Sequence, residues 1–192
     1  MLPRVYLPVS TPLASKILTT AVRVFAEEGL DAHLERIAKE AGVGSGTLYR
    51  NFPTREALIE AAYRNEVAKL CAAAPELLRA MPPRQALRAW MGRFLGYATT
   101  KLGMADALRA MIAAGGDPYG NSQELMLAAI SVLRQAGVEA CVVRPDIAPA
   151  DVLTMLTGTA LAAGRPEQRE QAERLLDFHL DAMSTGAGGA TT

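Results

Sequence analysis

The sequence predicts an all-α protein of about nine helices, with a small N-terminal head and a larger helical body. Half of its 192 residues are hydrophobic, and alanine and leucine, which both favour helices, dominate among them. Apolar residues recur at intervals of three and four along most of the chain, and residues typical of strands alternate nowhere over a useful length. These observations favour helices packed on helices around a sizeable core.

The first part of the chain predicts a disordered arm followed by a three-helix head. The arm, residues 1–12, holds three prolines and shows no helical period. Glycines stand at the ends of the first two predicted helices, where a left-handed residue commonly ends a helix. The head should span residues 13–56, and its helices are predicted over 13–29, 34–41 and 45–51.

The rest of the chain predicts a helical body over residues 57–183. A fourth helix, about 54–74, should connect head and body, with Thr54 as its N-cap and Pro75 just beyond its end. Residues 138–143 could extend the helix before them or form a short extended piece. The last residues, 184–192, should be a disordered tail. The helices of the body are predicted at 82–102, 104–112, 122–136, 149–163 and 166–183.

The two short helices of the head have the spacing of a helix-turn-helix, with the turn at Gly42. The second of them turns Leu48 inward and leaves a small, hydroxyl-bearing, aromatic and cationic face outward, which suits phosphates and base edges. The formal net charge of the chain is zero, so whole-chain charge gives no support to nucleic-acid binding. Residues 42–55, however, hold two arginines and no acid. This segment is therefore predicted to read DNA through a local patch.

Two segments, AVRVFAEEGL and LERIAKEAGVGSGTLYRNFPTREALIEAAY, resemble the TetR family of bacterial transcriptional regulators. The run TLYRNF, followed by a helix that opens TREAL, is highly specific for that family, and the likeness covers about residues 14–66. The resemblance implies a cytoplasmic bacterial protein that binds double-stranded DNA as a homodimer. It also implies a repressor on a palindromic operator, released by a small-molecule effector whose identity the residues do not give.

The resemblance also assigns residues of the head to DNA. Tyr49 corresponds to a tyrosine whose hydroxyl meets a phosphate, although a core aromatic is the structural alternative. Arg50 sits where family members often read a base, but a long arginine can equally reach a phosphate. Arg55 corresponds to a cation that binds phosphate at the start of the fourth helix. The predicted DNA contacts are His33, Ser45, Gly46, Thr47, Tyr49, Arg50, Asn51 and Arg55.

The head departs from the family pattern because it has few cations. His33 and Leu34 replace the usual hydroxyl residue at the start of the second helix, Ser45 lacks a neighbouring cation, and Asn51 is uncharged. Fewer cations release fewer counterions, so we expect modest affinity and a shallow salt dependence. The alternative function is a helical small-molecule-binding or dimerisation protein whose head binds DNA weakly.

Two sets of residues in the body are candidates for binding. Aromatic and methionine side chains at helical spacing could line an effector pocket or simply form core. The pocket candidates are Trp90, Phe94, Tyr97, Met104, Leu108, Met111 and Met155. The predicted helix at 149–163 is apolar almost all round, so two of its faces need covering, either within one chain or by a second copy. The resemblance implies a dimer through this helix and the last one. The interface candidates are Leu153, Leu156, Thr157, Ala160, Leu161, Leu176, His179 and Leu180.

The sequence gives no sign of an enzyme, and we expect no catalytic site, metal or cofactor. His33 and His179 are far apart and neither joins a cluster of cysteines or acids, and the phosphate-binding, nucleophile and zinc motifs of enzymes are absent. His179 is interpreted as a core or interface residue. Cys71 and Cys141 lack metal-type spacing and are expected to be buried free thiols, in preference to a disulfide or redox switch. No segment is long and apolar enough to predict a membrane span.

Overall fold

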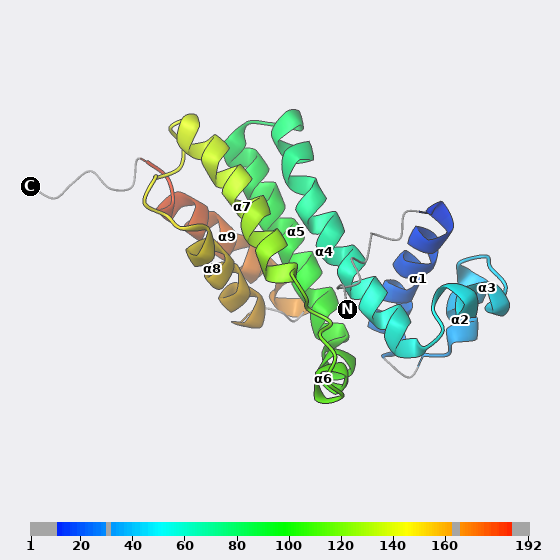
Figure 1. Cartoon of the computed structure of the whole chain (residues 1–192). Helices are drawn as coiled ribbons and strands as arrows, with labels where there is room; N and C mark the ends of the chain where they lie inside the picture. The colour runs from blue at the N-terminus through cyan, green and yellow to red at the C-terminus, as the bar shows by residue number, and fades with distance from the viewer. Residues whose placement is uncertain (1–10, 30–31, 163–165, 186–192) are drawn as a thin grey trace, which may run out of the picture. The chain divides into compact units, whose positions relative to one another are not determined.

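The structure, a computed structural model, describes residues 11–29, 32–162 and 166–185 (Figure 1). Within these ranges the regular elements are nine α-helices, α1–α9, and one short 3₁₀ helix. The all-α prediction is therefore confirmed. The predicted arm lies outside the described residues except for Thr11 and Pro12, and the predicted tail lies outside them beyond Thr185.

The helices divide into two compact units. Unit 1 contains the described residues up to Ala68, together with Thr100–Gly120. Unit 2 contains Lys69–Thr99 and the described residues from Asn121 onward. Two helices, α4 (Arg55–Ala80) and α5 (Pro83–Gly103), run from one unit into the other.

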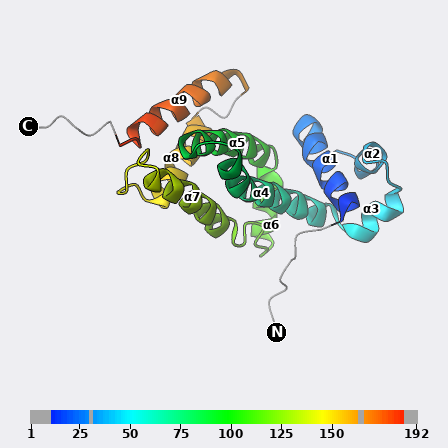
Figure 2. The same cartoon turned by 90° about the horizontal axis from the view of Figure 1, so that it is seen from above.

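The helices α1 (Pro12–Glu28), α2 (Leu34–Glu40) and α3 (Ser45–Asn51) lie together in unit 1 (Figures 1 and 2). The hydroxyl of Thr11 accepts a hydrogen bond from the backbone N–H of Ala14 at 3.3 Å, and Pro12 occupies the first turn, where a missing N–H costs little. The apolar stripe of α1 is buried. It consists of Ile17, Ala21, Val24 and Phe25.

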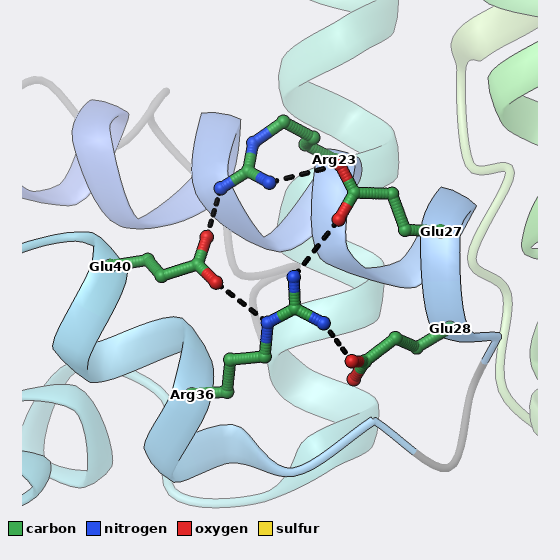
Figure 3. Close-up of polar contacts among 5 residues, drawn as sticks. All are labelled: Arg23, Glu27, Glu28, Arg36 and Glu40. Carbon is green, nitrogen blue, oxygen red and sulfur yellow. Dashed lines mark hydrogen bonds and ion pairs between the residues drawn. The ribbon is translucent and has the colours of Figure 1, made fainter.

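Five charged side chains join α1 to α2 on their exposed sides (Figure 3). The guanidinium of Arg36 donates to Glu40 at 2.6 Å and to Glu27 at 3.0 Å, and it also pairs with Glu28. The guanidinium of Arg23 donates to Glu27 at 3.0 Å and also contacts Glu40. Hydrogen bonds from both arginines hold the pKa of Glu40 below its usual range. This charge cluster therefore links α1 to α2 across their exposed sides.

Helix α4 begins as predicted but runs further. The hydroxyl of Thr54 accepts a hydrogen bond from the N–H of Ala57 at 3.1 Å, which confirms the cap. The predicted end near Ala74 was wrong, because Pro75 lies inside the helix and α4 continues to Ala80. A proline inside a helix costs about 3 kcal/mol. Here the ring of Pro75 is exposed, and buried Ala74 and Leu77 on either side of it secure the helix by tertiary packing.

In unit 1, the loop after α6 (Ala105–Ala113) contacts the first half of α4. The ring of Tyr63 meets the ring of Tyr119 edge-on, with centroids 5.4 Å apart. The ammonium group of Lys101 lies 4.6 Å from the centroid of the Tyr119 ring, and the guanidinium of Arg64 donates to the carbonyl of Asp117 at 3.2 Å. These contacts hold the loop to α4.

Unit 2 is built from α7 (Ser122–Glu139), α8 (Pro149–Ala162) and α9 (Arg169–Ala182), with parts of α4 and α5. Helix α8 packs on both α7 and α9. The predicted helix at 166–183 starts as a 3₁₀ turn, Pro166–Gln168, before it becomes α9. The indole N–H of Trp90 on α5 donates to the carbonyl of Leu70 on α4 at 2.8 Å, which satisfies a polar group in the core.

Residues 138–143 extend α7 as far as Glu139 and then form a turn. The N–H of Cys141 donates to the carbonyl of Val138, and the N–H of Val142 donates to that of Gly137, both at 2.9 Å. Cys141 has a φ of 55°, the left-handed conformation of a residue that follows a helix. Its place in this surface turn leaves it exposed, so the prediction of a buried thiol was wrong there.

The other cysteine, Cys71, is half-buried within α4. Burial raises the pKa of its thiol to about 11, so the protonated form dominates at neutral pH. Both cysteines are free thiols, as expected.

Candidate nucleic-acid interface

The backbone fixes the turn between α2 and α3. Gly42 has a φ of 68°, a conformation that glycine adopts without strain. Its N–H donates to the carbonyl of Lys39 at 3.0 Å, and the N–H of Val43 donates to the carbonyl of Ala38 at 2.9 Å. This pair of bonds is the common way to end a helix at glycine, and it confirms the predicted turn.

One side chain of α3 holds the helix to the rest of unit 1. Leu48 is 1% exposed, and Phe52, directly after the helix, is 4% exposed. Leu48 is the only buried residue of α3. Thr47 is half-buried, and the remaining predicted contacts on the helix are exposed, namely Ser45, Gly46, Tyr49, Arg50 and Asn51. Tyr49 is 42% exposed and therefore is not a core aromatic.

Two exposed side chains of α3 bond to their own helix. The Nε group of Arg50 donates to the carbonyl of Gly46 at 3.0 Å, and its Nη2 donates to the hydroxyl of Thr47 at 3.2 Å. The amide nitrogen of Asn51 donates to the carbonyl of Thr47 at 2.8 Å. Both side chains thus lie back toward the start of α3. Because these bonds are exposed to water, they can be exchanged for bonds to a ligand at little cost.

The hydroxyl of Tyr49 has a partner on another helix. It donates to Oε1 of Glu35, in the first turn of α2, at 3.5 Å. Glu35 was not among the predicted site residues, because it lies outside residues 42–55, the segment whose positive charge predicted the DNA-binding patch. The helix-turn-helix spacing itself was the signal that could have found it, since such a fold brings the start of α2 close to the second helix.

His33 and Arg55 lie near the start of α2. His33 is the exposed N-cap residue of α2, and its side chain makes no capping hydrogen bond. Arg55 donates to the carbonyl of Ala32 at 2.8 Å, so it ties the start of α4 to the segment before α2. Leu34, the residue after His33, is 6% exposed and belongs to the core.

A further cation lies at the turn. A Cβ atom placed on Gly42 would be 3.3 Å from the ammonium nitrogen of Lys16, so this side chain of α1 reaches the turn between α2 and α3. Lys16 was not predicted, because nothing local in α1 marks it. It adds a positive charge to the helix-turn-helix, for which the sequence predicted few cations.

The predicted pocket residues are distributed over both units. Met104, Leu108 and Met111 belong to unit 1, and Trp90, Phe94, Tyr97 and Met155 belong to unit 2. All of them are buried except the half-buried Met111 and Met155. In unit 2 the three aromatic rings form a run along α5, with centroid distances of 6.1 Å from Trp90 to Phe94 and 5.7 Å from Phe94 to Tyr97.

The predicted interface residues separate into two groups. Four of them are buried within the chain, namely Leu156, Ala160, Leu176 and Leu180. Leu153 and His179 are half-buried, and Thr157 and Leu161 are exposed. The ring of His179 lies 3.2 Å from the hydroxyl of Thr159, across α8 and α9, and burial lowers its pKa.

The most exposed large apolar side chains of unit 2 are Leu161 on α8, at 70%, and Phe178 on α9, at 66%. Phe178 was not predicted, because helical spacing puts it on the side of α9 opposite Leu176 and Leu180, which belong to the predicted interface. A phenylalanine on a polar helix face was the signal that could have found it.

In the described ranges, no group of three or more His, Cys, Asp or Glu residues could hold a metal ion. None of the helices described is both long enough and apolar enough to cross a membrane.

Family models match most of the chain. Residues 17–62 match the model described as bacterial regulatory proteins, tetR family, and residues 82–184 match the model described as transcriptional regulator SbtR-like, C-terminal domain. The chain belongs to the TetR family. The predicted family is therefore confirmed, and α2 and α3 are the DNA-binding helix-turn-helix of a TetR-family transcriptional regulator.

Solved structures agree with this assignment. A TetR transcriptional regulator, SCO0520 from Streptomyces coelicolor, is 64% identical, with a TM-score of 0.87 over 91% of this chain and 99% of that one. A TetR regulatory protein from Mycobacterium vanbaalenii is 30% identical, with a TM-score of 0.72 over 88% and 93% of the two chains. Among curated proteins, none matched the chain.

Proposed function

We propose that this TetR-family regulator is a homodimeric repressor that binds a palindromic operator through α3 and is released by a small-molecule effector. The observation that carries the proposal is the outward face of α3. There, Tyr49, Arg50 and Asn51 are exposed beside the backbone of Gly46, while the single buried residue, Leu48, holds the helix in place.

The side chains of this face suit DNA chemically. An arginine can form two hydrogen bonds to guanine, an asparagine can form two to adenine, and hydroxyl groups can donate to phosphates. These groups belong to Arg50, Asn51 and Tyr49. In the absence of DNA, the hydrogen bonds that they make within the chain are exposed to water. Lys16 and Arg55 add positive charge near the same helices. We therefore assign base contacts to α3 and phosphate contacts to Tyr49, Lys16 and Arg55.

The dimer is proposed to form through α8 and α9. Leu161 and Phe178 are large apolar side chains that are mostly exposed, and exposed apolar surface commonly marks a protein–protein contact. Beyond Asp151 in its first turn, helix α8 carries no charged residue, so the rest of the helix presents no charge that a second copy would have to desolvate. A twofold dimer on a palindrome places its two recognition helices about one DNA turn, about 34–36 Å, apart.

The effector is proposed to bind in the helical body, near the aromatic run of α5. To release DNA, it must bind the DNA-incompetent state more tightly than the DNA-binding state. Trp90 is the single tryptophan of the chain and lies in this run. A compound that binds there should change the tryptophan emission at the same concentrations at which it releases DNA.

Fluorescence anisotropy with labelled DNA tests the operator proposal. The wild-type chain should bind one duplex, from the flanks of its own gene or selected from a random pool, with a Kd in the nanomolar range that rises with salt. Arg50→Ala should weaken this binding by about 1–3 kcal/mol, or about five- to 150-fold, and relax the preference at one base position. The double variant Tyr49→Phe/Arg50→Ala should abolish the preference.

Arg79→Ala is the matched control. Arg79 is also an exposed helical arginine whose Nε donates to a carbonyl four residues earlier, that of Pro75. Its removal should leave DNA affinity unchanged. A wild-type chain that binds no selected or flanking duplex better than random DNA at low salt would contradict the operator proposal and favour a protein whose head binds DNA weakly.

A further inference from the structure

We infer that Glu35 limits the binding of this head to DNA of any sequence, because it places a carboxylate beside the tyrosine proposed to meet a phosphate. The inference rests on the proposed function, since it concerns the same surface. It assigns a role to a residue that neither the motif nor the charge count of the α3 segment identified.

The position of Glu35 is unlike that of the other partners of α3. Its Oε1 accepts a hydrogen bond from the hydroxyl of Tyr49 at 3.5 Å, and it lies on a different helix, in the first turn of α2. Arg50 and Asn51, by contrast, bond to neutral oxygens of α3 itself. Among these contacts, the one at Tyr49 brings a full negative charge to the proposed DNA surface.

The carboxylate and a bound phosphate would compete for the same hydroxyl. Tyr49 has one hydroxyl proton, so it can donate to Glu35 or to a phosphate, but not fully to both. A phosphate oxygen bonded to Tyr49 would lie about 3 Å from the hydroxyl, and so within about 6.5 Å of the Glu35 oxygen. That separation is shorter than the screening length of about 8–10 Å at ordinary salt, so the two negative charges repel each other.

This repulsion acts on the part of DNA binding that does not depend on sequence. Phosphate contacts supply almost all of non-specific affinity, while base contacts add the discrimination. A charge that opposes one phosphate contact therefore weakens binding to every duplex and leaves base contacts by Arg50 intact. Operator and non-specific sites are weakened by the same factor, so Glu35 leaves the specificity ratio unchanged and raises the share of the regulator that is free of DNA.

Anisotropy of the full-length chain with a labelled random-sequence duplex, over a range of salt concentrations, tests this role. Glu35→Gln keeps the length of the side chain and an acceptor oxygen but removes the charge. It should bind the random duplex about three- to tenfold more tightly at low salt. The difference should shrink as salt rises, and the salt dependence should become steeper.

Two controls separate charge at this position from other effects. Glu35→Asp keeps the charge but shortens the reach toward Tyr49, and it should stay within about twofold of the wild type. Glu139→Gln removes the same charge from α7, where Glu139 accepts a hydrogen bond from Gln135, and it should leave affinity unchanged. Thermal unfolding of each variant checks that the chain still folds.

The outcomes distinguish this inference from the proposed function. Wild-type DNA binding together with an unchanged affinity of Glu35→Gln overturns the role of Glu35 alone. Equal tightening by Glu35→Asp and Glu35→Gln, or by Glu139→Gln, overturns it as well. A wild-type chain that binds no duplex at low salt overturns both the inference and the proposed function.

Discussion

The exposed face of α3 and the exposed surface of α8 and α9 are built differently. On α3 the exposed side chains are polar, and Tyr49, Arg50 and Asn51 each have a hydrogen-bond partner within unit 1. On α8 and α9 the most exposed large side chains are Leu161 and Phe178, which cannot form such bonds. The first surface is satisfied in water as it stands. The second gains free energy only when something covers it.

This difference predicts how the binding of each surface depends on salt. A polar surface exchanges bonds with water one at a time, so its binding is graded and depends on salt. An apolar surface binds by removing area from water, which depends little on salt and much on shape. The proposed dimer should therefore persist at salt concentrations at which the regulator has already released DNA.

The largest effect is expected from charged substitutions in the apolar surface of α8 and α9. Leu161→Asp/Phe178→Asp places charges in the proposed contact between copies, where an unpaired charge must be desolvated. The dimer should weaken at least about a hundredfold, or about 3 kcal/mol. Sedimentation at micromolar concentration should then show one chain where the wild type shows two, and operator binding should fall with the loss of the second head.

The double variant Leu125→Asp/Val132→Asp is the matched control. These residues are the exposed large apolar side chains of α7, at 41% and 49% exposure. Their replacement should leave the dimer intact. If the α7 variant dissociates and the α8–α9 variant does not, the contact between copies lies on α7 instead.

The next effect concerns the charge cluster that supports the polar surface. Glu40→Gln removes the carboxylate that Arg36 and Arg23 share, so thermal unfolding at neutral pH should begin at a lower temperature than in the wild type. The dimer should be unaffected. A variant with the wild-type unfolding midpoint at every pH would show that the cluster contributes nothing to stability.

The pH dependence has a defined sign. The folded-state pKa of Glu40 is lowered from its ordinary value of 4.5, chiefly by hydrogen bonds from Arg36 and then from Arg23. The stabilisation is therefore fully present above that ordinary value and is lost as pH falls through the lowered pKa. Wild-type and Glu40→Gln midpoints, measured by circular dichroism from neutral to acid pH, should differ above the ordinary pKa and converge below the lowered one.

The smallest effect is expected from a substitution at Cys141, which belongs to neither surface. Cys141 adopts a left-handed backbone conformation, with a φ of 55°, which glycine adopts more easily. Cys141→Gly should therefore stabilise the chain by about 0.5–1 kcal/mol, measured by urea unfolding. DNA affinity and dimer mass should not change. A destabilised variant would mean that the cysteine side chain contributes packing at this turn.

The sequence predicted best what depends on a few neighbouring residues. The turn at Gly42, the cap at Thr54 and the buried Leu48 each rest on local chemistry, and all three were confirmed. The end of α4 was missed, because packing of Leu77 outweighs the local signal of Pro75.

Tertiary neighbours were harder to predict. A helix that is apolar almost all round, such as α8, gives no pattern that tells which face the chain itself covers, so buried Leu156 and exposed Leu161 looked alike. Glu35 and Lys16 were missed because they approach the α3 segment from other helices.

Thr47 gives the α3 surface a property that a list of DNA contacts would not include. Its hydroxyl accepts from Arg50 and its backbone carbonyl accepts from Asn51, so the threonine side chain itself restricts the rotamers of Arg50. An unrestrained arginine carries about 2 kcal/mol of rotamer entropy. Part of that entropy is already lost before DNA arrives. An exchange of residue 47 should therefore change how much rotamer entropy Arg50 loses on binding DNA, with Arg50 itself unaltered.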